Sequence, residues 1–170
     1  MNAGLLSSTT HTAEQVVRLL GLEPLDQEGG YFRRTAQSES LRPDGRHEWS
    51  LIYSLFTPEG FSALHRLKGD EIWCFHAGDA LESLRLGPGG AAAWVRLGVE
   101  CPQSVVAANT WQGTRLVAGG RWALVSCLVV PEFIWDDFEL GERDALLAAW
   151  PREAEGIRQL TRVQPVAGKK

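Results

Sequence analysis

Cysteine is scarce in this sequence: only Cys74, Cys101 and Cys127 occur among 170 residues, and they lie far apart. An odd and scattered set of cysteines does not build a disulfide framework, so this usage favours a reducing compartment. We expect the three thiols to be small buried residues of strands.

Long apolar runs and dense basic runs are missing as well. No stretch is apolar over the length that spans a bilayer, and the N-terminus has neither the basic start nor the apolar run of a secretion signal. We therefore expect a soluble, cytoplasmic protein with no membrane partner. The formal net charge is −4 without a basic cluster, so no positive face is offered to a phosphate backbone and nucleic acid is not an expected partner.

Internal repeats, low-complexity segments and long linkers are also lacking. A chain of 170 residues suffices for one substantial core, whereas two domains would each be small. The composition, 44% apolar and 22% charged, is that of an ordinary globular protein. We predict a single domain that covers residues 1–170.

Short runs of apolar, aromatic and β-branched residues alternate with glycine- and proline-rich turn signals along most of the chain. The predicted strands cover residues 28–35, 49–56, two segments within 61–78, 81–86, 91–97, 104–107, 112–117 and 121–130, with a hairpin at Gly119-Gly120 between the last two. About nine strands without intervening helices predict an all-β sandwich or barrel.

Helices are predicted only near the two ends. Thr12 and Gln15 have the spacing of a capping box, and Gly21 is placed to end the helix that they open. The predicted apolar stripe of this helix consists of Val16, Leu19 and Leu20. A second helix is predicted over residues 142–150, with a shorter helical piece up to residue 160, and we expect both to cap the barrel.

Residues 61–78 place a histidine and a carboxylate among strand-forming apolar residues. If side chains alternate, one strand presents Phe61, Ala63, His65 and Leu67 on a single face, and the next presents Glu71, Trp73 and Phe75. His65 and Glu71 then face the same enclosed space. This pattern predicts a ligand pocket between two strands.

This pattern resembles a motif of the cupin superfamily, whose members are small jelly-roll barrels. Their first motif is Gly-x5-His-x-His-x3,4-Glu-x6-Gly. His65, Glu71 and Gly78 match it, but Leu67 stands in place of the second histidine. The second motif resembles residues 105–112, with Gln112 in place of its histidine. The resemblance implies a cupin-type double-stranded β-helix with short terminal helices.

Nearly the whole chain resembles one cupin branch, the type-5 group, long classed as a domain of unknown function. The matching positions are Glu28-Gly29-Gly30-Tyr31-Phe32, Ser50-Leu51-Ile52-Tyr53, His65, Arg66, Asp70, Glu71, Trp73, Thr110-Trp111-Gln112, Cys127, Pro131, Phe133 and Asp137-Phe138-Glu139. The chain departs from the branch at Asp26, Gln27 and Glu132, where histidine, proline and glycine are usual. The resemblance also implies a homodimer.

A cupin metal site normally uses three histidines and one glutamate, and this chain offers only His65 and Glu71 at those positions. Leucine does not bind metal and a neutral amide is a poor ligand, so Leu67 and Gln112 remove half of the ligand set. We therefore expect no metal and no other cofactor.

Without a metal, His65 and Glu71 are the candidate catalytic residues, as an acid–base pair in an apolar, aromatic pocket. The candidate ligand-binding residues are Tyr53, Trp73, Trp111 and Gln112 in the pocket and Glu28, Tyr31 and Arg33 at its rim. A purely structural interpretation remains open: the pair then satisfies two buried polar groups, the aromatic residues are core, and the rim charges are solvated.

Two classes of function fit this pocket, and a third fits it less well. One is a metal-independent isomerase or epimerase acting on a carbohydrate-like or other small polar metabolite, with His65 removing a proton next to a carbonyl. The other is a protein that binds a small polar metabolite without converting it. The third is a degenerate metal-dependent oxygenase. Metal-free cupins that epimerise keto-sugars use a histidine base, but fold likeness does not transfer function.

Overall fold

The computed structural model describes residues 6–25 and 29–162. Its helices are α1 (Ala13–Leu20), α2 (Arg143–Ala149) and α3 (Ala154–Gln159), with short 3-10 turns at Pro88–Gly90, Trp135–Asp137 and Pro151–Glu153. Its strands are β1 (Glu23–Pro24), β2 (Tyr31–Gln37), β3 (Ser50–Phe56), β4 (Phe61–Leu67), β5 (Asp70–Gly78), β6 (Leu81–Leu86), β7 (Ala92–Leu97), β8 (Gln103–Val106), β9 (Trp111–Leu116), β10 (Ala123–Val130) and β11 (Phe138–Leu140). The predicted strands are confirmed to within a few residues, and β1 and β11 are additional.

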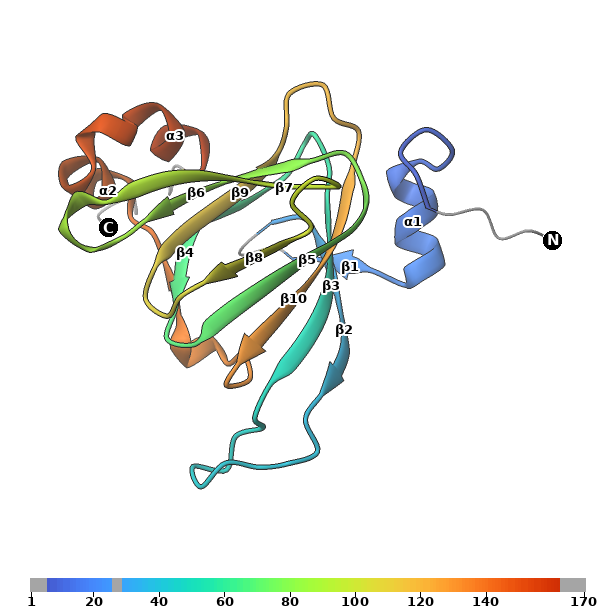
Figure 1. The fold of residues 1–170 in the computed structure, drawn as a ribbon, viewed down its shortest axis with the longest axis horizontal. Helices are drawn as coiled ribbons and strands as arrows, with labels where there is room; N and C mark the ends of the chain where they lie inside the picture. Colours follow the sequence, from blue (N-terminus) through green and yellow to red (C-terminus); the bar gives the residue numbers. More distant parts are fainter. Residues whose placement is uncertain (1–5, 26–28, 163–170) are drawn as a thin grey trace, which may run out of the picture.

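The described strands form two antiparallel sheets that face each other (Figure 1). One has the order β1-β2-β3-β10-β5-β8 and the other the order β11-β4-β9-β6-β7, so neighbours in each sheet are mostly distant in sequence. The core between the sheets draws on both, with Phe56, Trp73 and Val125 from one side and Leu81 and Leu116 from the other. The predicted jelly-roll barrel is confirmed.

Helix α1 begins where the sequence predicts it. The Thr12 side chain accepts a hydrogen bond from the Gln15 backbone N–H, and the Gln15 side chain accepts one from the Thr12 N–H, which satisfies two of the open donors of the first turn. Gly21 ends the helix with φ 61°, in the left-handed region that glycine adopts without strain. The predicted capping box and stop signal are confirmed.

The apolar stripe of α1 differs from the prediction at one position. Val16 is fully buried and packs with Ala13, Val17 and Leu20 against the outer face of the six-stranded sheet, whereas Leu19 is 65% exposed. Residues 13, 16, 17 and 20 follow the i, i+3, i+4, i+7 spacing of one helix face, and residue 19 lies off it. The prediction for Leu19 was wrong because Val17 completes the stripe instead.

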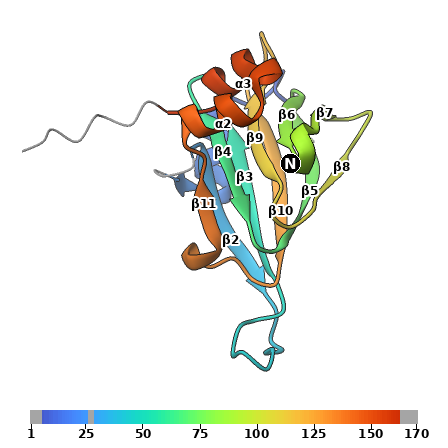
Figure 2. The same ribbon diagram turned by 90° about the vertical axis from the view of Figure 1, so that its left-hand side faces the viewer.

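Helices α2 and α3 lie on the opposite side of the molecule from α1 (Figures 1 and 2). Leu146 of α2 and Ile157 of α3 are buried with Leu64, Leu84 and Leu86, which project from the outer face of the five-stranded sheet. The C-terminal helices therefore cover a sheet face of the barrel. Within the part of the chain that the structure describes, no helix is long and apolar enough to cross a membrane.

Two glycine positions allow the chain to pass close to its own backbone. Gly78 has φ 100°, and a Cβ at this position would overlap the carbonyl oxygen of Trp122. Gly30 has φ 77°, and a Cβ there would lie 2.8 Å from the carbonyl oxygen of Leu55. Both the backbone angle and the contact require glycine, as expected for the turn after residues 61–78 and for the glycine pair before β2.

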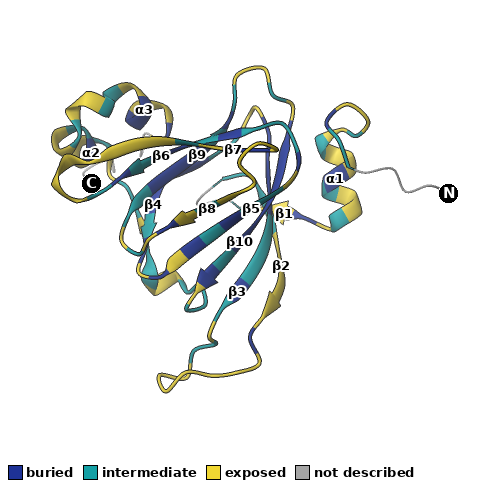
Figure 3. Ribbon diagram, in the orientation of Figure 1, coloured by how far each residue is buried: buried dark blue, intermediate teal, exposed yellow. Residues whose placement is uncertain are grey.

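The turn predicted at residues 42–45 lies at the tip of the long excursion between β2 and β3, which projects away from the barrel (Figure 1). Its Gly45 N–H donates to the Arg42 carbonyl at 2.9 Å, and Gly45 has φ 83°. Most of this excursion is exposed, whereas the buried residues concentrate on the central strands (Figure 3). The core and any enclosed site therefore lie between the sheets.

Candidate functional site

A cavity of about 460 Å³ opens between the two sheets. Its lining residues are Leu25, Phe32, Arg34, Ser50, Ile52, Ser54, His65, Leu67, Glu71, Trp73, Cys127, Val129, Glu132, Phe133, Ile134 and Trp135. This volume lies in the usual range of small-molecule sites, about 300–1,000 Å³. Most of the wall is apolar and a few polar groups interrupt it, which is the usual composition of a metabolite pocket.

A β-bulge in β4 sets which side chains of this strand enter the cavity. Ser62 pairs with Thr114 and His65 pairs with Gln112, so three residues of β4 advance against two of β9. The bulged backbone at Leu64 bonds elsewhere: its N–H donates to the Leu160 carbonyl at 2.7 Å and its carbonyl accepts from the Gly141 N–H at 2.7 Å. The C-terminal segment thus holds the bulge in place.

The bulge corrects one part of the predicted alternation. Phe61 packs with the outer cluster beneath the C-terminal helices, so it does not share a face with His65. His65 and Leu67 both line the cavity, and Glu71 and Trp73 join them from β5. The predicted meeting of His65 and Glu71 in one enclosed space is therefore found, but simple alternation along β4 fails at the bulge.

His65, Gln112 and Glu71 form one buried hydrogen-bonded group, and each side chain belongs to a residue that is 6% exposed or less. The Gln112 amide nitrogen donates to Glu71 Oε2 and lies 3.4 Å from His65 Nε2. At the other side of the ring, His65 Nδ1 lies 2.7 Å from the Ala63 carbonyl oxygen. Gln112 therefore links the imidazole to the carboxylate.

Arg85 lies behind this group and orients it. Its Nη1 donates to Gln112 Oε1 at 2.7 Å, and because a guanidinium only donates, the amide oxygen faces Arg85 and the amide nitrogen faces the cavity residues. Burial lowers the pKa of Arg85 to about 10, although the nearby Glu71 carboxylate acts in the opposite direction. The guanidinium remains charged at neutral pH and compensates the buried carboxylate.

The amide and the Ala63 carbonyl together define the imidazole tautomer. A carbonyl oxygen only accepts, so the Nδ1 of His65 carries a proton and donates it to Ala63. An amide nitrogen only donates, so the Nε2 of a neutral ring presents its lone pair on the side of Gln112. Nε2 is accordingly the nitrogen that takes up a proton when the ring becomes charged.

The residues at the expected cupin metal position do not fit a metal ion. Within the described ranges, no group of three or more histidine, cysteine, aspartate or glutamate side chains is placed to hold one. Leu67 lines the cavity where the family pattern has a second histidine, and Gln112 presents amide hydrogens to Glu71 and His65. A cationic guanidinium directly behind Gln112 further disfavours a second positive charge.

Aromatic residues close one end of the cavity. The Phe138 ring stacks on the His65 imidazole with centroids 5.1 Å apart, and Trp135 packs edge-on against both Phe133 and Phe138. Trp135 is nonetheless 48% exposed while it lines the cavity. An exposed aromatic ring at the mouth of a pocket is a contact surface for a ligand with a flat or ring-shaped face.

Ion pairs and a backbone hydrogen bond fix the segment that carries these rings. Asp137 pairs with Arg46 at 2.8 Å and with Lys68 at 3.2 Å, and the Phe133 N–H donates to Ser50 Oγ at 2.9 Å. The segment is thereby tied to the excursion between β2 and β3, to the turn after β4 and to the inner face of β3. These contacts fix the position of the segment that forms the mouth of the cavity.

The structure brings together four of the predicted site residues. His65, Glu71 and Trp73 line the cavity, and Gln112 joins the first two. Tyr53 lies instead on the outer face of β3, where it packs with the α1 cluster and contacts His76 edge-on at 5.6 Å between ring centroids.

The other predicted ligand contacts also lie away from this cavity. Trp111 packs on the outer face of β9 with the C-terminal helices, and the Arg66 guanidinium lies 4.6 Å from its ring centroid. Arg33 is exposed on β2 and is absent from the cavity lining, and Tyr31 belongs to a different hollow. Because strand neighbours face opposite sides, Phe32 and Arg34 line the cavity instead. Glu28 lies outside the described residues.

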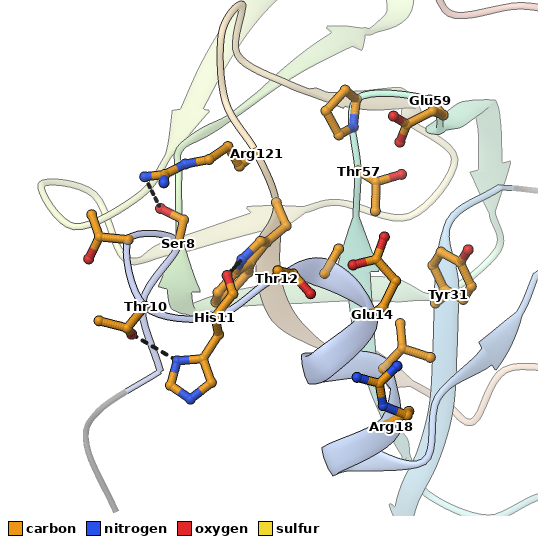
Figure 4. Close-up of a pocket in the computed structure, with 15 residues that line it drawn as sticks. Ser8, Thr10, His11, Thr12, Glu14, Arg18, Tyr31, Thr57, Glu59 and Arg121 are labelled. Atoms are coloured by element: carbon orange, nitrogen blue, oxygen red, sulfur yellow. Dashed lines mark hydrogen bonds between the residues drawn. The ribbon is translucent and has the colours of Figure 1, made fainter.

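The hollow that Tyr31 lines is a second one, between α1 and the six-stranded sheet, with a volume of about 640 Å³ (Figure 4). Thr57 and residues of the segment before α1 line it as well. Its charged residues are of both signs and include Glu14, Arg18, Glu59 and Arg121. Arg121 bonds Ser8 at 3.5 Å across one side of it. It contains neither His65 nor Glu71.

Sequence reasoning missed Arg85 and the aromatic mouth as parts of the site. In β6, Arg85 shares the inward face with Leu81 and Ser83, but Leu84 and Leu86 on the other face are buried as well, so the alternation of this strand gave no signal for an inward arginine. Phe133 and Phe138 were recognised only as positions that match the cupin branch. Their packing against His65 required the fold.

Comparison with known proteins agrees with this architecture. The family model described as Cupin superfamily (DUF985) matches residues 14–141. Protein SO0799 from Shewanella oneidensis is 34% identical over 91% of this chain and 100% of that chain, with a TM-score of 0.85. A hypothetical protein from Leishmania major is 31% identical over 90% of this chain and 100% of that chain, with a TM-score of 0.81.

More distant structures share the fold alone. A cupin 2 conserved barrel domain protein from Rhodopseudomonas palustris is 18% identical over 84% of this chain and 90% of that chain, with a TM-score of 0.58. A search of curated proteins finds no significant match. The two-sheet barrel with an inward histidine and glutamate is a cupin. Within the cupins, the chain belongs to the type-5 family, DUF985.

Proposed function

We propose that this protein is a metal-independent isomerase or epimerase that acts on a carbohydrate-like or other small polar metabolite. His65 is the base that removes a proton from a carbon next to a carbonyl, and a second group returns a proton. Glu71 lines the same cavity and stabilises the imidazolium that forms.

The observation that carries this proposal is the single tautomer set by the neighbours of His65. Nδ1 is held by the Ala63 carbonyl, Nε2 is the proton acceptor, and the Glu71 carboxylate is attached to the same group through Gln112. A general base needs a lone pair on a known nitrogen and a compensated charge after proton transfer. With Nδ1 bonded to Ala63 the lone pair of the neutral ring is on Nε2, and in catalysis it turns from the Gln112 amide, 3.4 Å away, to the substrate.

A second candidate is a protein that binds a small polar metabolite without converting it. The near-complete burial of His65 and Gln112 favours this alternative, because a buried network also serves to satisfy polar groups within a barrel. Both candidates use the same cavity, so they differ in turnover and not in binding.

Exchange of carbon-bound hydrogen with solvent separates the two candidates. Free sugars with a carbonyl group are incubated with the protein in D2O, and loss of the neighbouring C–H signal is followed by proton NMR. We expect His65→Gln to lower the exchange rate by about 10²–10⁴-fold, the usual contribution of a general base, while ligand binding measured by saturation-transfer NMR persists.

His76→Gln is the matched control, because His76 lies on the outer face of β5 against Tyr53 and does not line the cavity. Its exchange rate should equal that of the wild type. Binding without any exchange by the wild type would identify a binding protein, and unchanged exchange by His65→Gln would remove His65 from the mechanism.

A further inference from the structure

The indole N–H of Trp73 is a buried hydrogen-bond donor without an acceptor among the described residues. The residue is 2% exposed and its side chain lines the cavity. An unpaired buried donor destabilises a folded protein, so such groups are normally satisfied by protein, by water or by a ligand. A donor of this kind in a cavity wall is a site for a ligand oxygen.

Trp73 also has a fixed place relative to the proposed base. It follows Glu71 by two residues on β5, so both side chains face inward, at a spacing of roughly 7 Å along the strand. Glu71 is joined to His65 through Gln112. His65, Glu71 and Trp73 therefore line one cavity, in which a small molecule can contact the base and the indole together.

The charge near the indole favours an oxygen that becomes negative. The Arg85 guanidinium lies 6.0 Å from the centroid of the Trp73 ring, and it is charged at neutral pH. A preorganised donor with a nearby cation in a largely apolar cavity stabilises an oxyanion far more than water-exposed groups do. The ring itself is held by packing against Phe56, at 5.9 Å between centroids.

We propose that the Trp73 indole N–H binds the carbonyl oxygen of the substrate and stabilises the enolate that His65 creates. The substrate class is thus a small polyhydroxy carbonyl compound, an aldose or ketose in its open form, and not the corresponding polyol. This inference rests on the proposed function and assigns a further catalytic residue to it.

The proton balance of the step is simple. The C–H bond next to the carbonyl breaks, the proton passes to His65 Nε2, and the electron pair forms the carbon–carbon double bond of the enolate while the oxygen takes the negative charge. The imidazolium or a second group then returns a proton either to the same carbon or to the former carbonyl carbon. In the second case the proton of the neighbouring hydroxyl passes to the oxyanion as that hydroxyl becomes the new carbonyl, so no oxidant or reductant is needed.

Indole NMR tests the hydrogen bond without requiring turnover. The chain has seven tryptophans, and the indole resonance of Trp73 is assigned in 15N-labelled protein as the one lost in Trp73→Phe, or by backbone-linked assignment of the wild type if that variant does not fold. Titration with dihydroxyacetone and D-fructose should shift this resonance downfield and saturably. Glycerol and D-sorbitol, which lack the carbonyl, should leave it in place.

Activity provides the second measurement. Trp73→Phe retains an aromatic ring and loses the donor, so we expect the maximal exchange rate to fall by about 10²-fold with a much smaller change in KM, as for loss of one oxyanion donor. Trp150→Phe is the matched control: its indole N–H also lacks an acceptor among the described residues, but the ring packs with the C-terminal helices outside the cavity.

The outcomes separate this inference from the proposed function. A Trp73 resonance unmoved by either carbonyl compound, or moved equally by the polyols, overturns the inference, and so does an exchange rate equal in Trp73→Phe and the wild type. A shifted resonance without exchange by the wild type supports the carbonyl site and contradicts the isomerase. Exchange by the wild type without a shift of the Trp73 resonance supports the isomerase and contradicts the carbonyl site.

Discussion

At the scale of single residues, the chain replaces two expected metal ligands with an amide and a leucine, and Gln112 then bonds the two ligands that remain. The motif spacing sufficed to predict that His65 and Glu71 share a pocket. The role of Arg85 was not predictable in the same way. A single arginine in an apolar strand gives the same sequence pattern whether its side chain faces solvent or the interior of the barrel. Its partner is 27 residues away on β9.

Gln112→Leu should destabilise the protein by about 1–3 kcal/mol, since it removes one hydrogen bond to the buried Glu71 carboxylate and one to the Arg85 guanidinium while it preserves side-chain bulk. The free energy of unfolding is measured in urea. Gln103→Leu on the edge strand β8 is the control and should stay within about 0.5 kcal/mol of the wild type, because Gln103 is exposed. Equal losses in the two variants would show that the Gln112 network adds nothing to stability.

At the scale of elements, turn residues predicted the strands well. The cap of α1 and the strand Leu81–Leu86 follow from local sequence alone, because their signals lie within a few residues of one another. The β4 bulge was missed because tertiary hydrogen bonds hold it: Leu64 bonds Leu160 and Gly141, which lie 96 and 77 residues further along the chain. Strands as short as β1 and β11 carry no periodic pattern to detect.

Two turns, one at the end of β5 and one between β9 and β10, offer a prediction at this scale. Gly119→Ala should cost about 1–2 kcal/mol from its left-handed backbone alone, since nothing lies within 4 Å of the added Cβ. Gly78→Ala should cost a further 1–3 kcal/mol, roughly, because its Cβ also overlaps the Trp122 carbonyl. Urea unfolding measures both. A Gly78 variant as stable as the Gly119 variant would contradict the close approach.

At the scale of the whole molecule, the cupin barrel was predictable because many spaced motif residues agree with one fold. The placement of ligand residues was predictable only in part. Tyr53 and Trp111 are aromatic strand residues next to site residues, but strand alternation directs them to the outer faces, beneath α1 and the C-terminal helices. The homodimer that the family resemblance implies stays a prediction, which light scattering on purified protein checks.

The central claim is that the His65–Gln112–Glu71 group performs its chemistry without a metal ion. Elemental analysis of the purified protein by mass spectrometry tests this claim most directly, with the double variant Leu67→His, Gln112→His as the reference, because it restores the ligand types of the family pattern. The account predicts far less than one transition metal ion per wild-type chain and about one ion per chain of the double variant. A wild-type protein that carries one transition metal ion per chain would contradict it.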